Sequence, residues 1–170
     1  MSVKIILEGN KILKKKSLPV KIFDKKLRDL AQDMIEYGKS VDNCVGIAAV
    51  QVGVLLRMSV IYVEDEWEVM INPKILFEDT KLSSEWEGCM SLEDGNLFGR
   101  VKRPNKLIVE YVNENNKRRT YQFEGFYSHL ILHEIDHMNG IMFLDLMKKP
   151  YKLVSNDDLE KIYKEKDSIK

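Results

Sequence analysis

The chain has 170 residues, of which 44% are hydrophobic and 32% are charged. This composition is typical of one soluble globular domain, expected over residues 1–170 with a tail from about residue 150. Lysine and arginine together number 27, as do aspartate and glutamate, so no net charge attracts nucleic acid. No apolar span of about 20 residues predicts a membrane helix, and the basic N-terminus has too few apolar residues for a secretory leader. We therefore expect a cytoplasmic protein with no membrane partner and no specificity for nucleic acid.

Apolar residues at helical spacing predict a first helix over residues 25–38, with Asp24 as its N-cap and Gly38 at its end. Segments rich in β-branched and aromatic residues then predict four strands, at residues 58–63, 69–73, 106–112 and 118–126. The polar segment NENNK separates the last two strands, which predicts an antiparallel hairpin.

Two further helices are expected in the C-terminal part of the chain. The first covers residues 127–139 and has Gly140 as its natural stop. The second covers residues 156–166, has Ser155 or Asn156 as its N-cap and is expected to pack weakly. Helices that bracket a run of strands indicate an α+β fold. We expect mainly antiparallel β-sheets packed around the central helix, with one helix near each end of the chain.

The segment HEIDH at residues 133–137 is the strongest functional signal. On a helix, His133 and His137 lie on one face, one turn apart, and can bind one metal ion. Glu134 lies beside the first ligand and can exchange protons with a water that the ion activates. The alternative is a pair of core histidines with a solvated glutamate. Two of the three histidines of the chain lie in this segment, which favours metal-assisted hydrolysis.

A hydrolytic metal site needs a third protein ligand and one open position. His129 lies one turn before His133, but three ligands one turn apart would span about 12 Å of helix, too far for one ion. His129 is therefore expected to pack or to lie at the rim. The longer pattern H-E-x-x-H-x-x-G-x-x-H has Phe143 in place of its last histidine, which excludes that class of protease. Glu160 would suit another class of metallopeptidase.

Cys89 is the other candidate for the third ligand. It lies in WEGCMS, where Gly88 lets the backbone approach closely, and a thiolate is a stronger donor than a carboxylate. The alternative is a buried apolar thiol. The second cysteine, Cys44, is distant in the sequence, and a disulfide between the two is not expected in a reducing compartment.

Three segments together resemble peptide deformylase: VGIAAVQ at 45–51, EGCMS at 87–91 and HEIDH at 133–137. Their order and spacing also match, over roughly residues 3–148. The resemblance implies removal of the formyl group from the N-formylmethionine of nascent polypeptides, with release of formate, and work at the ribosome. It implies one divalent ion, Fe(II) as the usual native one, while a thiolate and imidazole set also accepts Zn(II), Ni(II) or Co(II). We expect the protein to act as a monomer.

Carried over residue by residue, the resemblance implies three metal ligands, namely Cys89, His133 and His137. It makes Glu134 the general base and acid. The side-chain amide of Gln51, otherwise read as a surface polar group, and the backbone N–H of Met90 become donors to the oxyanion that forms from the formyl group. The metal itself supplies the third stabilising interaction. Backbone groups of Val45 and Gly46 would pair with the substrate peptide as an added strand.

The chain departs from the motifs of the family at positions that would contact the substrate rather than the metal. Cys44 replaces a glycine, Glu93 stands where many members have proline, and Leu132 replaces a common glutamine. Ile47 and Met90 replace leucines with little change of volume. None of these changes removes a ligand, an oxyanion donor or the proton carrier. We therefore expect an active enzyme with an altered rim of the substrate site.

Three other functions fit part of the sequence. A deformylase-like protein that binds metal with little activity is favoured by the changes at Cys44 and Glu93. A structural zinc site would need a fourth ligand, which is hard to find in the sequence. A metallopeptidase that cleaves internal bonds would lose its metal on replacement of Glu160 and not on replacement of Cys89.

Overall fold

The structure has the α+β fold that the sequence predicts. It is a computed structural model and describes residues 3–167. The α-helices of this part of the chain are α1 (Lys25–Ser40), α2 (Phe126–Met138) and α3 (Asn156–Asp167). Short 3-10 helices are found at η1 (Lys11–Lys14), η2 (Ala49–Val52), η3 (Glu93–Gly95) and η4 (Phe143–Leu146). None of the helices between residues 3 and 167 is both long and apolar enough to cross a bilayer.

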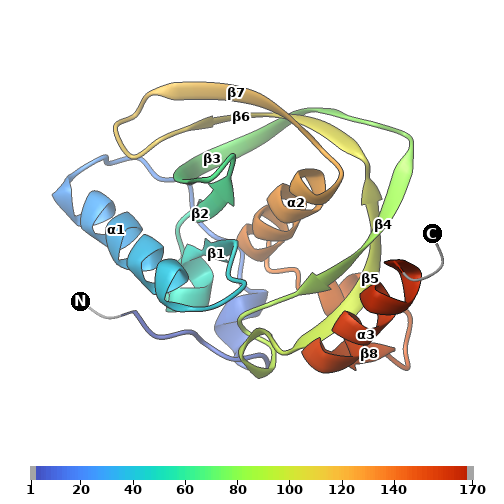
Figure 1. Cartoon of the computed structure of the whole chain (residues 1–170). Helices are drawn as coiled ribbons and strands as arrows, with labels where there is room; N and C mark the ends of the chain where they lie inside the picture. Colours follow the sequence, from blue (N-terminus) through green and yellow to red (C-terminus); the bar gives the residue numbers. More distant parts are fainter. Residues whose placement is uncertain (1–2, 168–170) are drawn as a thin grey trace.

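The strands form two antiparallel sheets. In spatial order, the larger sheet contains β1 (Gly46–Ala48), β2 (Met58–Val63), β3 (Glu66–Glu78), β6 (Lys106–Val112) and β7 (Arg118–Glu124). The smaller sheet contains β4 (Leu82–Gly88), β5 (Leu97–Pro104) and β8 (Leu153–Ser155). Helix α2 lies between the sheets and contacts strands of both, while α1 packs against β1 and β2 (Figure 1). Helix α3 lies beside β5 and β8 at the other side of the molecule from α1 (Figure 1).

Strand β2 buries both of its faces, which explains its continuous apolar sequence. Met58 and Val60 belong to a core cluster with residues of α1, whereas Ile61 and Val63 belong to a second cluster with residues of α2. A third cluster contains Cys89 together with residues of η4. The central helix is therefore fixed by core packing, and its histidines are held in place by the same contacts that stabilise the fold.

The first helix is two residues longer than predicted, and Gly38 does not end it. The side chain of Asp24 accepts from the backbone N–H of Leu27 at 3.0 Å, as expected for an N-cap. At its other end α1 continues to Ser40. The ring of Trp67 packs so closely on Gly38 that a Cβ there would overlap it. Gly38 is therefore a packing residue and not a helix stop.

Strand β3 extends well beyond the predicted strand at 69–73, because it bends at Asn72 instead of ending. Asn72 has a φ of 51°, and the register with β6 shifts between Ile71 and Lys74. The side chain of Asn72 accepts from the N–H of Val20 at 2.9 Å and donates to its carbonyl at 2.8 Å. These bonds to a distant segment hold the irregular backbone, which no local pattern indicates.

Four strands, β1, β4, β5 and β8, are missing from the sequence-based prediction. Two of them have only three residues, and the other two have few apolar side chains, so that pairing rather than propensity determines them. The hairpin of β6 and β7 is confirmed, although β7 ends at Glu124 and not at residue 126. Helix α2 begins and ends one residue earlier than predicted.

The C-terminal helix is confirmed within one residue, and Ser155 is its cap. The hydroxyl of Ser155 accepts from the N–H of Asp158 at 3.2 Å. The expectation that this helix packs weakly is wrong for Leu159, which is 7% exposed.

Candidate metal centre and substrate cleft

Helix α2 and the end of β4 bring three donor side chains together. His133 and His137 lie one turn apart on α2, and Cys89 directly follows β4. The two Nε2 atoms are 3.1 Å apart, and Nε2 of His137 is 3.3 Å from Sγ of Cys89. Within residues 3–167 this is the one group of His, Cys, Asp or Glu side chains found suited to an ion, with the three donor atoms within 4.8 Å of one another. All three side chains are buried.

The orientation of His133 is fixed by Glu87, to which the sequence analysis assigns no role. Nδ1 of His133 lies 3.0 Å from Oε2 of Glu87. An ionised carboxylate only accepts, so Nδ1 carries a hydrogen, and once the ring is neutral its lone pair is on Nε2, directed at Cys89 and His137. Carboxylates commonly support metal-binding histidines in this way. The three donors and the carboxylate behind them therefore fit a divalent ion.

Glu87 is held in turn by Arg103 of β5. Nε of Arg103 donates to Oε1 at 2.6 Å and Nη2 donates to Oε2 at 2.9 Å, while Nη1 reaches Asp136 at 2.7 Å. Burial by itself would raise the pKa of Glu87. Hydrogen bonds from Arg103, His129 and His133 outweigh that effect and hold the pKa of Glu87 well below its usual range. The carboxylate stays ionised, as the support of a ligand histidine requires.

His129 does not belong to the donor group, in agreement with the distance argument. It is also buried rather than at the rim, with 2% of its surface exposed. Its Nδ1 lies 2.9 Å from Oε1 of Glu87, and its Nε2 lies 3.0 Å from the hydroxyl of Ser83. His129 is therefore a second histidine on the same carboxylate, one turn of helix away from the first.

Without an ion, the two donor histidines differ in their affinity for protons. Burial opposes a charge on His133, but hydrogen bonds to Cys89 and Glu87 raise its pKa well above the ordinary value. Burial, together with the nearby charge on His133, lowers the pKa of His137. A ligand imidazole must be neutral, so uptake of an ion would displace a proton from His133 and would tighten as pH rises.

Gln51 is buried, so the reading of it as a surface polar group is wrong. Its Oε1 accepts from the N–H of Ala48 at 2.8 Å, which leaves the amide nitrogen directed toward the metal centre. That nitrogen lies 3.1 Å from the hydroxyl of Ser91 and 3.4 Å from Sγ of Cys89. The side chain is thus fixed at both ends, with a hydrogen-bond donor beside the donor group.

Glu134 lies beside the donor group and is 2% exposed. Its Oε2 has no hydrogen-bond partner in the structure. Burial is the largest influence on this carboxyl and raises its pKa to about 7. A Cβ at Gly46 would come within 2.5 Å of Oε1 of Glu134 and within 2.8 Å of Leu130. Gly46 therefore makes room for the carboxyl group of Glu134, a role that the sequence analysis does not foresee.

Strand β1 lies at the edge of the five-stranded sheet. The carbonyl of Val45 accepts from the N–H of Tyr62 on β2 at 2.8 Å. Backbone groups of successive residues point to opposite sides of an antiparallel strand, so those of Gly46 face away from β2. An extended peptide could pair with Gly46 along this edge.

The donor group opens into a cavity of about 780 Å³. One wall comes from the segment between α1 and β1, another from the end of β4 and η3, and a third from α2. Residues of α3 complete the lining. The cavity reaches Gln51, Cys89, His133 and Glu134, so that a peptide inside it could meet all of these groups at once.

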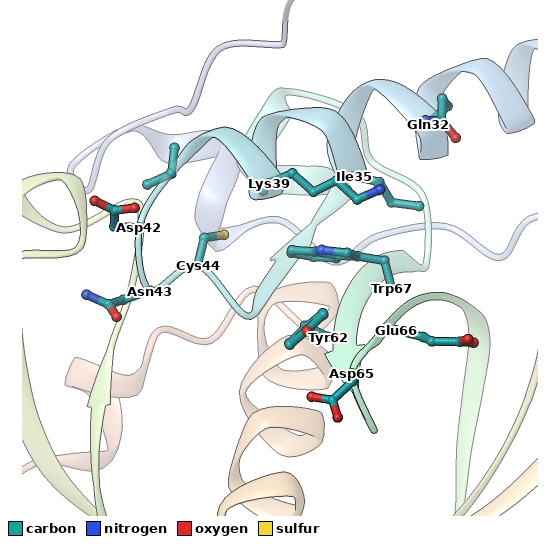
Figure 2. A pocket seen from close by; sticks show the side chains of 12 residues that line it. Gln32, Ile35, Lys39, Asp42, Asn43, Cys44, Tyr62, Asp65, Glu66 and Trp67 are labelled. Atoms are coloured by element: carbon teal, nitrogen blue, oxygen red, sulfur yellow. The ribbon is translucent and has the colours of Figure 1, made fainter.

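Cys44 lies in the lining of this cavity and also of a second one between the end of α1 and the β2–β3 turn. Figure 2 shows the second cavity, with the ring of Trp67 lying across it below Ile35 and Lys39. Burial is the largest cause that raises the pKa of the Cys44 thiol, to about 12, and Glu134 adds to it. Cys44 is therefore a neutral thiol, and it does not belong to the donor group, which contains Cys89.

The remaining candidates are spread over the rim and the core. Met90 and Glu160 line the cavity, but Glu160 is exposed and pairs with Lys164 at 3.4 Å. It is not in the donor group. Glu93 is exposed on η3 with a φ of 47°. Leu132, expected to affect the substrate rim, instead packs in the core cluster of α2.

The comparisons with known proteins agree with this geometry. The sequence model of the family described as polypeptide deformylase matches residues 2–152. Peptide deformylase 2 of Clostridium acetobutylicum is 40% identical over 143 residues, which are 84% of this chain and 93% of that protein. Peptide deformylase of Rhizobium meliloti is 36% identical over 155 residues, or 88% and 87% of the two chains. The crystal structure of peptide deformylase from Thermotoga maritima superposes with a TM-score of 0.82 at 32% identity, covering 87% of this chain and 99% of the other. The chain therefore belongs to the polypeptide deformylase family.

Proposed function

We propose that Cys89, His133 and His137 hold one divalent ion and that Glu134 carries protons while the chain removes the formyl group from N-terminal methionine. Enzymes of this family perform that reaction on nascent peptides. The structure of peptide deformylase from Acinetobacter baumannii, 29% identical to this chain, is bound to Met-Ala-Ser. A peptide with a free methionine at its start is what deformylation leaves behind.

When bound, a divalent ion supplies Lewis acidity, which polarises the formyl carbonyl and activates water at neutral pH. Glu134 takes the proton of the attacking water and delivers it to the amine that leaves. Without an ion, burial raises the pKa of Glu134 to about 7, close to the ambient pH at which a group that must accept and then donate a proton works best. The free Oε2 of Glu134 is available for this exchange.

Two donors would stabilise the oxyanion that forms from the formyl oxygen. The amide nitrogen of Gln51 is held beside Cys89 by the bond between Oε1 and the N–H of Ala48. The backbone N–H of Met90, next to Cys89, would be the second. Donors that are already oriented lose little free energy to reorganisation during the reaction. Backbone groups of Gly46, at the edge strand, would align the substrate peptide, whereas the carbonyl of Val45 is already bonded to Tyr62 of β2.

We further propose Fe(II) as the native ion, with Zn(II), Ni(II) or Co(II) as functional substitutes, because a thiolate with two imidazoles suits all four. The enzyme would act in the cytoplasm, at the ribosome, where formylated chains emerge. It would act there as a monomer.

The observation that carries the proposal is the convergence of three buried donors next to a carboxyl group with an unpartnered oxygen. The test is a formate assay with a formyl-Met peptide, paired with elemental analysis of protein purified without oxygen. We expect one ion per chain and the release of one formate for each formyl-Met peptide that is consumed. Metal without formate would favour the inactive, deformylase-like alternative, and cleavage of internal bonds would favour a metallopeptidase.

A further inference from the structure

The donor group of the metal centre is divided between two elements of the fold. Helix α2 carries both donor histidines, whereas Cys89 directly follows β4. The two elements are far apart in the sequence and lie side by side in the structure (Figure 1). The position of α2 relative to β4 therefore decides whether the three donors meet.

His129 joins these two elements at two points of β4. Its Nδ1 lies 2.9 Å from Oε1 of Glu87, and its Nε2 lies 3.0 Å from the hydroxyl of Ser83. Within residues 3–167, α2 and β4 share three side-chain hydrogen bonds, and two of them belong to His129. The third joins His133 to the same carboxylate. Most of the polar link between the helix and the strand thus depends on one imidazole ring.

The bond from His129 also completes the hydrogen bonding of Glu87. Oε1 accepts from Nε of Arg103 and from Nδ1 of His129. Oε2 accepts from Nη2 of Arg103 and from Nδ1 of His133. Each carboxylate oxygen has two lone pairs, so all four acceptor sites are used. Because His129 and Glu87 are both buried, loss of one donor here leaves an acceptor without a partner.

We propose that His129 is a positioning residue that orders the metal centre before an ion binds. It fixes α2 against β4 and, through Glu87, fixes the ring of His133. The inference rests on the proposed function, because it takes Cys89, His133 and His137 as the ligands. A site whose parts are already ordered loses less free energy to ordering when its ligand enters. His129 therefore tightens ion binding without being a ligand itself.

The experiment measures the Kd of the metal-free protein for Co(II), by competition with a chelator and through the visible absorption of the bound ion. His129→Leu removes both bonds but keeps an apolar side chain in the core. It should raise the Kd about 10–100-fold, the range for lost partners of ligand histidines. His129→Asn keeps an amide nitrogen where Nδ1 stands and loses only the bond to Ser83. It should raise the Kd about two- to fivefold, as should Ser83→Ala, which removes the same bond.

Ser128→Ala is the matched control. Ser128 is buried on the same helix, and its hydroxyl donates to the carbonyl of Pro104 on β5 at 2.6 Å. The variant therefore also loses a hydrogen bond that holds α2, but one that does not involve Glu87. Its Kd for Co(II) should equal that of the unchanged protein.

An unchanged Kd in His129→Leu would overturn the role of His129. A rise of the same size in Ser128→Ala would overturn it too, because any lost bond of α2 would then weaken the centre. If His129→Leu does not fold, Ser83→Ala decides, and a Kd equal to that of the unchanged protein counts against the proposal. The unchanged protein tests the ligand set separately: if it takes up no Co(II), the proposed function fails, and this inference fails with it.

Discussion

Arg103 holds both carboxylate oxygens of Glu87, from Nε to Oε1 at 2.6 Å and from Nη2 to Oε2 at 2.9 Å. Both side chains are almost completely buried. Arg103→Met would leave a buried carboxylate without its counter-charge, so the free energy of unfolding should fall by about 3–5 kcal/mol. Arg103→Lys should recover only part of this, because an ammonium cannot bind both oxygens in the same planar geometry.

Urea unfolding of the metal-free protein would measure this loss. Arg118→Met is the matched control, because Arg118 pairs with Glu110 at 2.8 Å but is 73% exposed. Loss of this exposed ion pair should lower the free energy of unfolding by about 1 kcal/mol or less. Similar losses for the two variants would show that burial of the Glu87 pair is unimportant for stability.

The two buried cysteines should respond differently to replacement. Cys89→Ala should abolish stoichiometric metal binding, because Sγ is one of three converging donors. Cys44→Ala should retain one ion per chain, since Cys44 is a neutral thiol outside the donor group. Elemental analysis after anaerobic purification distinguishes the two. Retention of metal by Cys89→Ala would remove the thiolate from the proposed ligand set.

Glu134→Gln should keep the ion and the fold while kcat falls by about 100-fold or more, the scale of general acid–base catalysis. Glutamine has nearly the same shape but cannot accept the proton. Glu160→Gln, at an exposed position of the same cavity, should keep kcat within about twofold and keep its metal. Formate release and metal content are measured together. Unchanged turnover in Glu134→Gln would refute the assigned role.

The pKa of Glu134 predicts how the stability of the metal-free protein depends on pH. Burial raises this pKa from 4.5 to about 7. Between these two values the unfolded chain has lost the proton that the folded chain keeps, so stability falls as pH rises through this window. Glu134→Gln lacks this loss. The free energy of unfolding of this variant, minus that of the unchanged protein, should therefore rise by about 3 kcal/mol between pH 4.5 and pH 8. Urea unfolding at both pH values checks this, and a gap independent of pH would contradict it.

Oxygen sensitivity tests the proposed native ion. If Fe(II) is bound, exposure to air should inactivate the enzyme by oxidising the iron and then Cys89, which would appear as sulfinic or sulfonic acid in mass spectra. The same protein loaded with Ni(II) or Zn(II) should lose activity more slowly. An iron-loaded enzyme that stays active in air would contradict this expectation.

Much of the metal centre could be predicted because its parts are local. His133, Glu134 and His137 lie within five residues, and the periodicity of one helix places both rings on the same face. The strands with continuous or alternating apolar residues were also predictable, since burial determines their sequences. Residue chemistry made Cys89 a candidate ligand, and the family motif supported it and added Gln51; no local period connects either residue with the helix.

The tertiary structure alone decided what supports and surrounds those groups. Glu87 and Arg103 meet because β4 pairs with β5, and Glu87 reaches His133 because α2 packs against these two strands. The bend at Asn72 depends in the same way on a distant backbone segment. Helix α3 is placed beside the cavity by the pairing of β8 with β5 and by its own contacts with β5. Hydrogen bonds and contacts between segments far apart in sequence leave no periodic trace in either one, so a single sequence determined the reacting groups but not the scaffold that orients them.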